Sequence, residues 1–250
     1  MLIDLQRDRF DVVLVSPRNP LNIGAAARAM ANFGFSHLAV VAPFEAHWRE
    51  ARSAVGAPDL LENAQQHPAL ADAVAACTLV IGTGTLTYRK PGQRVVFLPD
   101  LAPLVRLELE RSGRVALVFG PEKHGLTRND LSLCHILLEI PTDPRQPSMN
   151  LGQAVAVCLY ELAVRRAAND APTNTEIRPS APCGDLELLA TIVEQAMVSA
   201  DYSRGSMGEA NRHELRLMLR RLAPSASDTR KLLGLFRRIV WRLNRSRGHD

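Results

Sequence analysis

Continuous apolar runs recur along the first 140 residues of the chain. They are rich in Val, Ile and Leu and alternate little with polar residues, which is typical of strands buried on both faces of a parallel sheet. A weaker run at 94–98 has the same character, and we predict a strand there too. The clear runs, each predicted to form a strand, are FDVVLV (10–15), HLAVVA (37–42), CTLVIG (77–82), RVALVFG (114–120) and HILLEI (135–140).

Between these runs the apolar positions follow a helical period. Gly34 stands where a glycine often ends a helix, directly after the first of these periodic segments. The predicted helices cover residues 22–33, 59–76, 99–109 and 150–167. Alternation of strands and helices predicts an α/β domain, here over residues 1–167.

The chain changes character after this domain. Residues 168–183 are rich in Pro, Asn, Thr and Ala and lack periodicity, so we predict a linker. Each of the next three stretches, 185–200, 208–222 and 227–246, carries one apolar stripe. Three such helices would bury their stripes against one another, which predicts a small all-α domain over residues 184–250.

The positive charge of the chain is concentrated at its C-terminal end. The whole chain has 30 Lys and Arg against 26 Asp and Glu, whereas residues 201–250 alone have 12 against 5. This excess favours a module that binds a polyanion such as RNA. A solvated helix surface is the alternative, and the charge alone does not decide between the two.

Other features restrict the class of protein. The sequence contains no uncharged apolar run of about 18 residues, and the charged N-terminus does not resemble a signal peptide. We therefore expect a cytoplasmic protein without a membrane partner. The four cysteines form no Cys-x-x-Cys pair and the seven histidines are scattered, so we expect neither a disulfide framework nor a metal site.

The first candidate site is the segment SPRNPLNIGAAARAMANFG (16–34), which joins a strand to a helix. Gly24 and the three alanines after it leave the first turns of this helix almost without side chains. Free N–H groups at such a helix start suit an anion or another ligand. Arg28 is the single charged residue of the helix. The alternative, which this segment taken alone favours, is an Ala-rich helix packed tightly on a sheet.

Two further turns follow buried strands. LVFGPEKHGLTRNDL carries Glu122 just after a strand, and IPTDPRQPSMNLGQ carries Ser148 and Asn150 at the start of a helix. Ligands of open parallel sheets bind at the carboxyl ends of strands, where these turns would lie. Ordinary helix capping is the alternative role for the polar residues of both turns.

Taken together, NIGAAARA, FGPEKHGLT and IPTDPRQPSMNLGQAVAVCLYEL resemble the three motifs of the SpoU (TrmH-like) branch of the SPOUT methyltransferases. The resemblance covers about residues 10–165. The C-terminal extension makes the chain most similar to the TrmJ type, which methylates the ribose 2′-hydroxyl at tRNA position 32. The resemblance implies an α/β-knot fold with residues 114–165 in a trefoil knot, S-adenosylmethionine as cofactor, tRNA as partner, and a homodimer.

The resemblance also assigns roles to individual residues. Arg28 would hold the target ribose or its phosphate and stabilise the charge that develops on the ribose oxygen. A general base is the alternative role that the family gives this Arg, but stabilisation of charge is the simpler assignment, because a guanidinium has almost no neutral form. The catalytic positions correspond to Asn22, Arg28, Glu122, Ser148 and Asn150. The methyl donor would lie against Thr83, Gly84, Thr85, Gly120, Ile140, Pro147, Ser148 and Met149.

Departures from the family pattern concern the choice of substrate. Pro121 stands where many members have an Arg. The segment IGTGTLTYRK matches the cofactor loop of the family, but only loosely in its spacing to Arg89. Another tRNA position or rRNA is therefore the alternative substrate. A dinucleotide-binding enzyme is a weaker alternative, because Gly82-x-Gly84 lacks a third glycine at Thr87. The other alternative function is that of a non-catalytic RNA-binding protein with the same domain.

Overall fold

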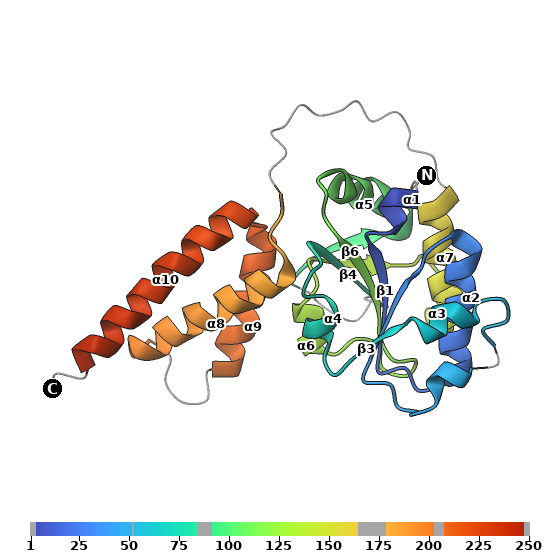
Figure 1. The fold of residues 1–250 in the computed structure, drawn as a ribbon, viewed down its shortest axis with the longest axis horizontal. Coiled ribbons are helices and arrows are strands. Elements are labelled where there is room, and N and C mark those ends of the chain that lie inside the picture. The colour runs from blue at the N-terminus through green and yellow to red at the C-terminus, as the bar shows by residue number, and fades with distance from the viewer. Residues whose placement is uncertain (1–3, 52, 85–91, 165–178, 203–207, 248–250) are drawn as a thin grey trace.

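The computed structural model describes residues 4–51, 53–84, 92–164, 179–202 and 208–247. Within these ranges seven strands form one sheet, and every pairing in it is parallel (Figure 1). Their order across the sheet is β3-β2-β1-β6-β4-β7-β5. The strands are β1 (Phe10–Val15), β2 (His37–Val41), β3 (Gln65–His67), β4 (Leu79–Thr83), β5 (Arg94–Phe97), β6 (Val115–Phe119) and β7 (Ile136–Glu139).

All six strands predicted from apolar runs are present, including the weaker one, which forms the edge strand β5. β1 and β6 lie side by side near the centre and are buried along their whole length, as uninterrupted apolar runs predict. Four other strands separate β1 and β6 in the sequence. Their pairing places the turn after β6 beside the turn after β1.

The predicted helix over 59–76 is wrong. This segment folds into α3 (Pro58–Glu62), strand β3 and α4 (Leu70–Ala73). β3 is a polar edge strand that pairs only with β2, and its residues Gln65 and Gln66 are exposed. An edge strand of this kind buries no apolar face, so it leaves no apolar run or alternation in the sequence.

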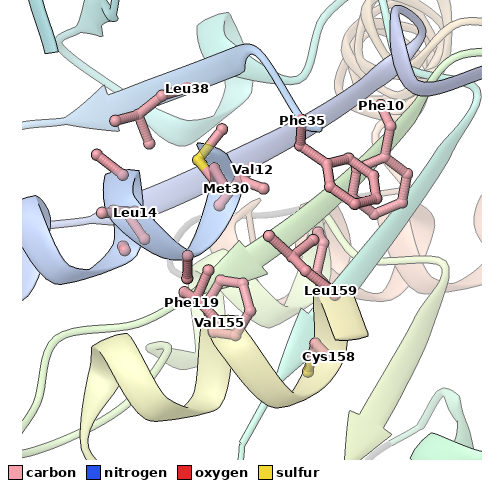
Figure 2. Packing of buried hydrophobic residues seen from close by; sticks show 14 of the residues in the cluster. Phe10, Val12, Leu14, Met30, Phe35, Leu38, Phe119, Val155, Cys158 and Leu159 are labelled. Carbon is pink, nitrogen blue, oxygen red and sulfur yellow. The ribbon is translucent and has the colours of Figure 1, made fainter. Parts of the chain in front are cut away.

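Helices cover both faces of the sheet. α2 (Pro20–Phe33), α5 (Leu101–Glu110) and α7 (Leu151–Val164) pack on one face, where Phe10, Val12 and Leu14 of β1 meet them (Figure 2). The alternate residues Val13 and Val15 point to the other face, against a core that includes residues of α4. The remaining short elements are α1 (Asp4–Arg7), η1 (Trp48–Glu50), η2 (Leu98–Asp100) and α6 (Arg128–Ser132).

The ends of α2 follow from its sequence. Asn19 caps the helix by accepting a hydrogen bond from the Leu21 N–H at 2.9 Å, and Pro20 occupies its first position. The helix therefore begins two residues before the predicted start. Gly34 ends it with a φ of 72°, which confirms the predicted glycine cap.

The C-terminal region is helical, as predicted. It consists of α8 (Cys183–Ser199), α9 (Gly208–Leu222) and α10 (Ala226–Arg247). These helices share a small apolar core that contains Leu189, Leu215 and Leu233. The start of α8 also belongs to the core of the sheet, because Cys183 is buried there and its N–H donates to the Cys77 carbonyl at 2.8 Å.

Polar contacts complete the docking of these helices. Arg216 of α9 donates to the Asn129 side chain of α6 at 2.8 Å, and Arg128 donates to His213 at 3.2 Å. Arg216 and the buried Arg220 both pair with Glu187 of α8. Figure 1 shows α8 and α9 beside α4 and α6, while α10 extends away from the sheet.

Residues 165–178, which include most of the predicted linker, are not among the described residues, and the domain division stays a prediction. The threading of residues 114–165 into a knot also stays a prediction. None of the helices in the described ranges is long and apolar enough to cross a membrane.

Candidate active site

Glu122 is the centre of a polar cluster at the carboxyl ends of β1 and β6. Its Oε1 accepts a hydrogen bond from Asn22 Nδ2 at 2.8 Å and another from the Asn19 N–H at 3.3 Å. Its Oε2 accepts from the Arg18 N–H at 3.2 Å. The carboxylate thus joins the turn after β6 to the turn after β1.

Asn150 extends this cluster to the start of α7. Its Nδ2 donates to Asn22 Oδ1 at 2.9 Å, while its Oδ1 accepts from the N–H groups of Gly152 and Gln153 at 2.9 and 3.3 Å. Asn150 is therefore the N-cap of α7, as the capping alternative proposed, and it also contacts Asn22. Glu122, Asn22 and Asn150 form one hydrogen-bonded chain in which both amides have a defined orientation.

Small residues let the two helices approach. α2 and α7 run in the same direction, because Asn22 contacts Asn150 near their starts and Phe33 contacts Tyr160 further along both. A Cβ atom added at Gly152 would lie 2.7 Å from the Cβ of Ala25, so only glycine fits at this crossing. Gly24 is likewise packed closely against Ser53. The bare helix start is thus filled by protein, and the tight-packing alternative is correct for Gly24.

The environment of Glu122 favours its ionised form. Partial burial raises the pKa of the carboxyl, but hydrogen bonds from the Asn22 side chain and from backbone N–H groups outweigh this effect and lower the pKa below its ordinary value. The positive ends of α2 and α7 lie on the same side and act in the same direction. The site therefore presents a fixed negative charge within reach of a cationic ligand.

Arg28 does not take part in the hydrogen-bonded chain of Glu122, Asn22 and Asn150. It lies on α2 two turns beyond Asn22, about 9 Å further along the helix axis. Its side chain is exposed, and within the described ranges it makes no hydrogen bond or ion pair. Of the five predicted catalytic residues, the structure thus links Asn22, Glu122 and Asn150 directly and leaves Arg28 free at the surface.

A cavity of about 250 Å³ opens beside Glu122. Glu122 lines it, and so does Ser148, the fifth predicted catalytic residue. Thr85, predicted to bind the methyl donor, lies outside the described residues. The other residues predicted to hold the donor all line this cavity: Thr83, Gly84, Gly120, Ile140, Pro147, Ser148 and Met149.

The walls of the cavity are built largely from backbone. A Cβ atom at Gly120 would lie 2.3 Å from the Leu126 nitrogen, so the turn after β6 closes only around a glycine. Thr83 Oγ1 donates to the Val118 carbonyl at 2.9 Å, and the Gly84 N–H donates to the Leu138 carbonyl at 3.2 Å. These bonds hold the ends of three strands around one space.

Sequence reasoning missed the apolar side of this cavity. Phe119, Leu126, Leu151 and Ala154 line it together with Thr142. Each of them lies in or beside the turns selected from the sequence, but an apolar residue in such a turn looks the same as a core residue. These apolar side chains, together with the polar backbone groups of the turns, suit a ligand that carries an aromatic ring such as a purine.

The described part of the chain contains no group of His, Cys, Asp and Glu side chains that could hold a metal ion. All four cysteines are buried and free. Burial raises the pKa of the Cys158 thiol to about 12, which keeps it protonated and unreactive.

The protein has a parallel sheet with a cavity and a polar chain at its carboxyl edge, where three turns selected from the sequence meet. This arrangement places it in the class of α/β methyltransferases. Residues 9–160 match the family model described as the SpoU rRNA methylase family, which spans more than half of the chain. The chain belongs to the SpoU methylase family.

Individual relatives match nearly the whole chain. The tRNA (cytidine/uridine/adenosine-2′-O-)-methyltransferase TrmJ of Pseudomonas aeruginosa is 35% identical over 240 residues, which are 93% of either chain. The tRNA (cytidine/uridine-2′-O-)-methyltransferase TrmJ of Citrobacter koseri is 33% identical and aligns over 91% of this chain and 95% of its own. The crystal structure of TrmJ from Zymomonas mobilis (Z. mobilis ZM4) has a TM-score of 0.80 at 29% identity, covering 92% of this chain and 98% of that one.

Proposed function

We propose that this chain transfers a methyl group from S-adenosylmethionine to a ribose 2′-hydroxyl of tRNA. The observation that carries the proposal is the cavity at the carboxyl edge of the sheet, which gathers residues predicted to bind the methyl donor next to the Glu122–Asn22–Asn150 chain. Membership of the SpoU family and relatives named as tRNA 2′-O-methyltransferases over more than nine-tenths of the chain support it. We further propose position 32 as the target and the cytoplasm as the location.

The residues of the cavity fit S-adenosylmethionine. The apolar wall around Leu126 and Leu151 suits the adenine ring, and the ionised Glu122 lies where a positive charge on the ligand would be stabilised. When bound, the cofactor supplies an electrophilic methyl group carried by a sulfonium ion. The protein has to hold the ribose hydroxyl in line with this group and to exclude water.

The polar chain would orient the substrate. Asn22 and Asn150 are held by Glu122 and by the start of α7, so their amides need no rearrangement when RNA binds. We assign to Arg28 the stabilisation of negative charge on the ribose oxygen or the binding of its phosphate. Its exposed guanidinium, unpaired within the described ranges, is available for such a contact.

We propose that the chain works as a homodimer through α7. Val157, Tyr160 and Val164 form an exposed apolar face at helical spacing, and Tyr160 packs its ring edge-on to Phe33 of α2 at 5.9 Å. This face lies on the helix whose N-cap is Asn150, so a second copy seated there would reach the site. Sedimentation velocity at the enzyme concentration of the assay tests this arrangement, and a monomer there contradicts it.

The C-terminal helices supply the surface for the rest of the tRNA. The segment 229–247 of α10 contains seven Lys and Arg and no acidic residue. Trp241 lies between the guanidinium groups of Arg238 and Arg245, 4.2 and 5.3 Å from its ring centroid. This arrangement fixes the direction of two cations on an exposed face, as binding of phosphates requires.

A methylation assay tests the proposal directly. Purified protein, unmodified tRNA transcripts and S-adenosylmethionine with a labelled methyl group should give 2′-O-methylated ribose in the tRNA, with position 32 as the mapped site. Methylation at another position would refute only the choice of nucleotide. Absence of transfer to any tRNA, together with no binding of S-adenosylmethionine by calorimetry, would overturn the function.

A further inference from the structure

An exposed aromatic ring lies against one of the residues that hold the Glu122 carboxylate. Phe44 follows β2, and 71% of its surface is accessible to solvent. Its backbone is nevertheless anchored, because the Phe44 N–H donates to the Pro17 carbonyl at 3.2 Å. The guanidinium of Arg18 lies over the ring, 5.7 Å from its centroid. Arg18 and Phe44 thus form an exposed pair across the turns after β1 and β2.

The backbone on both sides of this pair is held in an unusual conformation. Ser16 and Ala42, which end the two strands, have φ values of 45° and 41°, a region that residues other than glycine rarely adopt. Both are held by hydrogen bonds to the neighbouring strand, from Ser16 N–H to Val41 and from Ala42 N–H to His67. Such conformations persist where the direction of a loop matters.

The pair is connected directly to the candidate active site. The Arg18 N–H donates to Glu122 Oε2 at 3.2 Å, so the residue that covers Phe44 also holds the carboxylate. Asn19, the next residue, donates to the other oxygen of the same carboxylate. The ring of Phe44 is therefore linked to the site through one residue, Arg18, whose backbone binds the carboxylate and whose side chain contacts the ring.

The charge at this rim is available to a ligand. Within the described ranges no carboxylate pairs with the Arg18 guanidinium, and the side chain is exposed. An aromatic face next to an unpaired guanidinium is the combination that binds single-stranded RNA, in which a base stacks on the ring and the cation contacts its phosphate. An apolar partner would leave this cation without a counter-charge.

We propose that Arg18 and Phe44 form a platform for a nucleotide adjacent to the methylated one, with the base on Phe44 and its phosphate on Arg18. The inference rests on the proposed function, because it takes RNA as the substrate. The platform would position the strand so that the target ribose reaches Asn22 and Glu122. Arg18 and Phe44 are thus positioning residues, and they take no part in the methyl transfer itself.

The test compares KM and kcat for tRNA. Stacking of one base contributes about 1–3 kcal/mol, so Phe44→Ala should raise KM roughly 5- to 150-fold and leave kcat and the affinity for S-adenosylmethionine unchanged. Phe44→Trp should keep the wild-type KM, because it keeps an aromatic face. Phe44→Leu, which keeps an apolar side chain of similar size, should behave like Phe44→Ala.

Phe97 provides the matched control. It is also an exposed phenylalanine, with 52% of its surface accessible, but it lies on the edge strand β5 and does not line the cavity. Phe97→Ala should leave KM unchanged. Arg18→Gln should raise KM and lower the slope of log Kd against log salt by about 0.7, the value for one phosphate of a single strand.

The outcomes separate the platform from its alternatives. A wild-type KM in Phe44→Ala, or full recovery in Phe44→Leu, would overturn stacking. Leu21 on the same rim is also exposed, so dissociation of an oligomer in Phe44→Ala would assign this surface to a second copy of the chain instead. If the wild-type protein methylates no tRNA, the proposed function fails, and the platform is then judged by the Kd for tRNA alone.

Discussion

Asn150 allows helix capping to be separated from the alignment of the candidate site. Its Oδ1 caps α7 through the N–H groups of Gly152 and Gln153, and its Nδ2 donates to Asn22. Asn150→Ala removes both functions. Asn150→Asp keeps a side-chain oxygen that caps a helix about as well as Asn does, but it replaces the donor with a second acceptor.

The two variants should therefore differ in stability. Loss of an N-cap costs typically about 1 kcal/mol, which lowers the Tm of a chain of this size by roughly 2–4 °C. We expect that decrease for Asn150→Ala and a Tm close to wild type for Asn150→Asp. The hydrogen bond to Asn22 is exposed to solvent, so its loss should add little to the change in stability.

Both variants should nevertheless lose methyl transfer. In Asn150→Asp the Asn22 Oδ1 loses its donor and faces a carboxylate oxygen, so this hydrogen bond is lost and the orientation of the Asn22 amide is no longer fixed from that side. Loss of one oriented hydrogen bond in the transition state, about 1.4 kcal/mol, corresponds to a tenfold slower reaction. Initial rates at saturating tRNA and S-adenosylmethionine, with thermal melts of the same samples, measure both effects. Wild-type rates in Asn150→Asp would refute the role of the polar chain, and equal destabilisation of the two variants would refute the capping argument.

Three further predictions concern other parts of the molecule. Arg28→Ala should bind S-adenosylmethionine normally but slow single-turnover methyl transfer about 10²-fold or more, and a rate within about twofold of wild type would remove Arg28 from the reaction. Replacing Arg238 and Arg242 together by Gln should weaken tRNA binding and reduce its salt slope by about 1–2, whereas an unchanged slope would mean that α10 contacts no phosphate. Burial, with a smaller effect of Arg220, lowers the pKa of His135 from 6.5 to about 3, so the folded protein keeps this ring neutral while the unfolded chain takes up a proton. The free energy of unfolding should therefore decrease as the pH falls below 6.5. In urea titrations on either side of that pH, His135→Asn should make this decrease shallower. The same pH dependence in the variant and the wild type would contradict the assignment.

The apolar pattern predicted most of the sheet because most of its strands are buried on both faces. β3 was missed because Gln65 and Gln66 face solvent at the edge, where a strand needs only backbone pairing. The order of the strands could not be predicted either. Without the pairing of β1 with β6, nothing in the sequence places Glu122 against Asn22.

The candidate site was predicted in its composition but not in its contacts. Resemblance to the family selected Asn22, Arg28, Glu122 and Asn150 together, yet the structure joins only three of them and leaves Arg28 apart. Periodicity cannot distinguish a helix residue that joins the polar chain, such as Asn22, from one that does not, such as Arg28. The position of a residue on a helix face does not tell which loop will fold against it. Phe44 was missed for a related reason, since an isolated aromatic residue after a strand carries no signal of its exposure.

The burial of Cys183 in the core of the sheet has a consequence for how the enzyme selects RNA. Because the start of α8 is buried in the core of the sheet and α10 packs on α8, the basic helix α10 is held at a set distance from the cavity. This spacing sets the distance between the cavity and the surface of α10. If α10 binds tRNA as proposed, an RNA that presents the right nucleotide but has the wrong length between that nucleotide and the part bound by α10 would be a poor substrate.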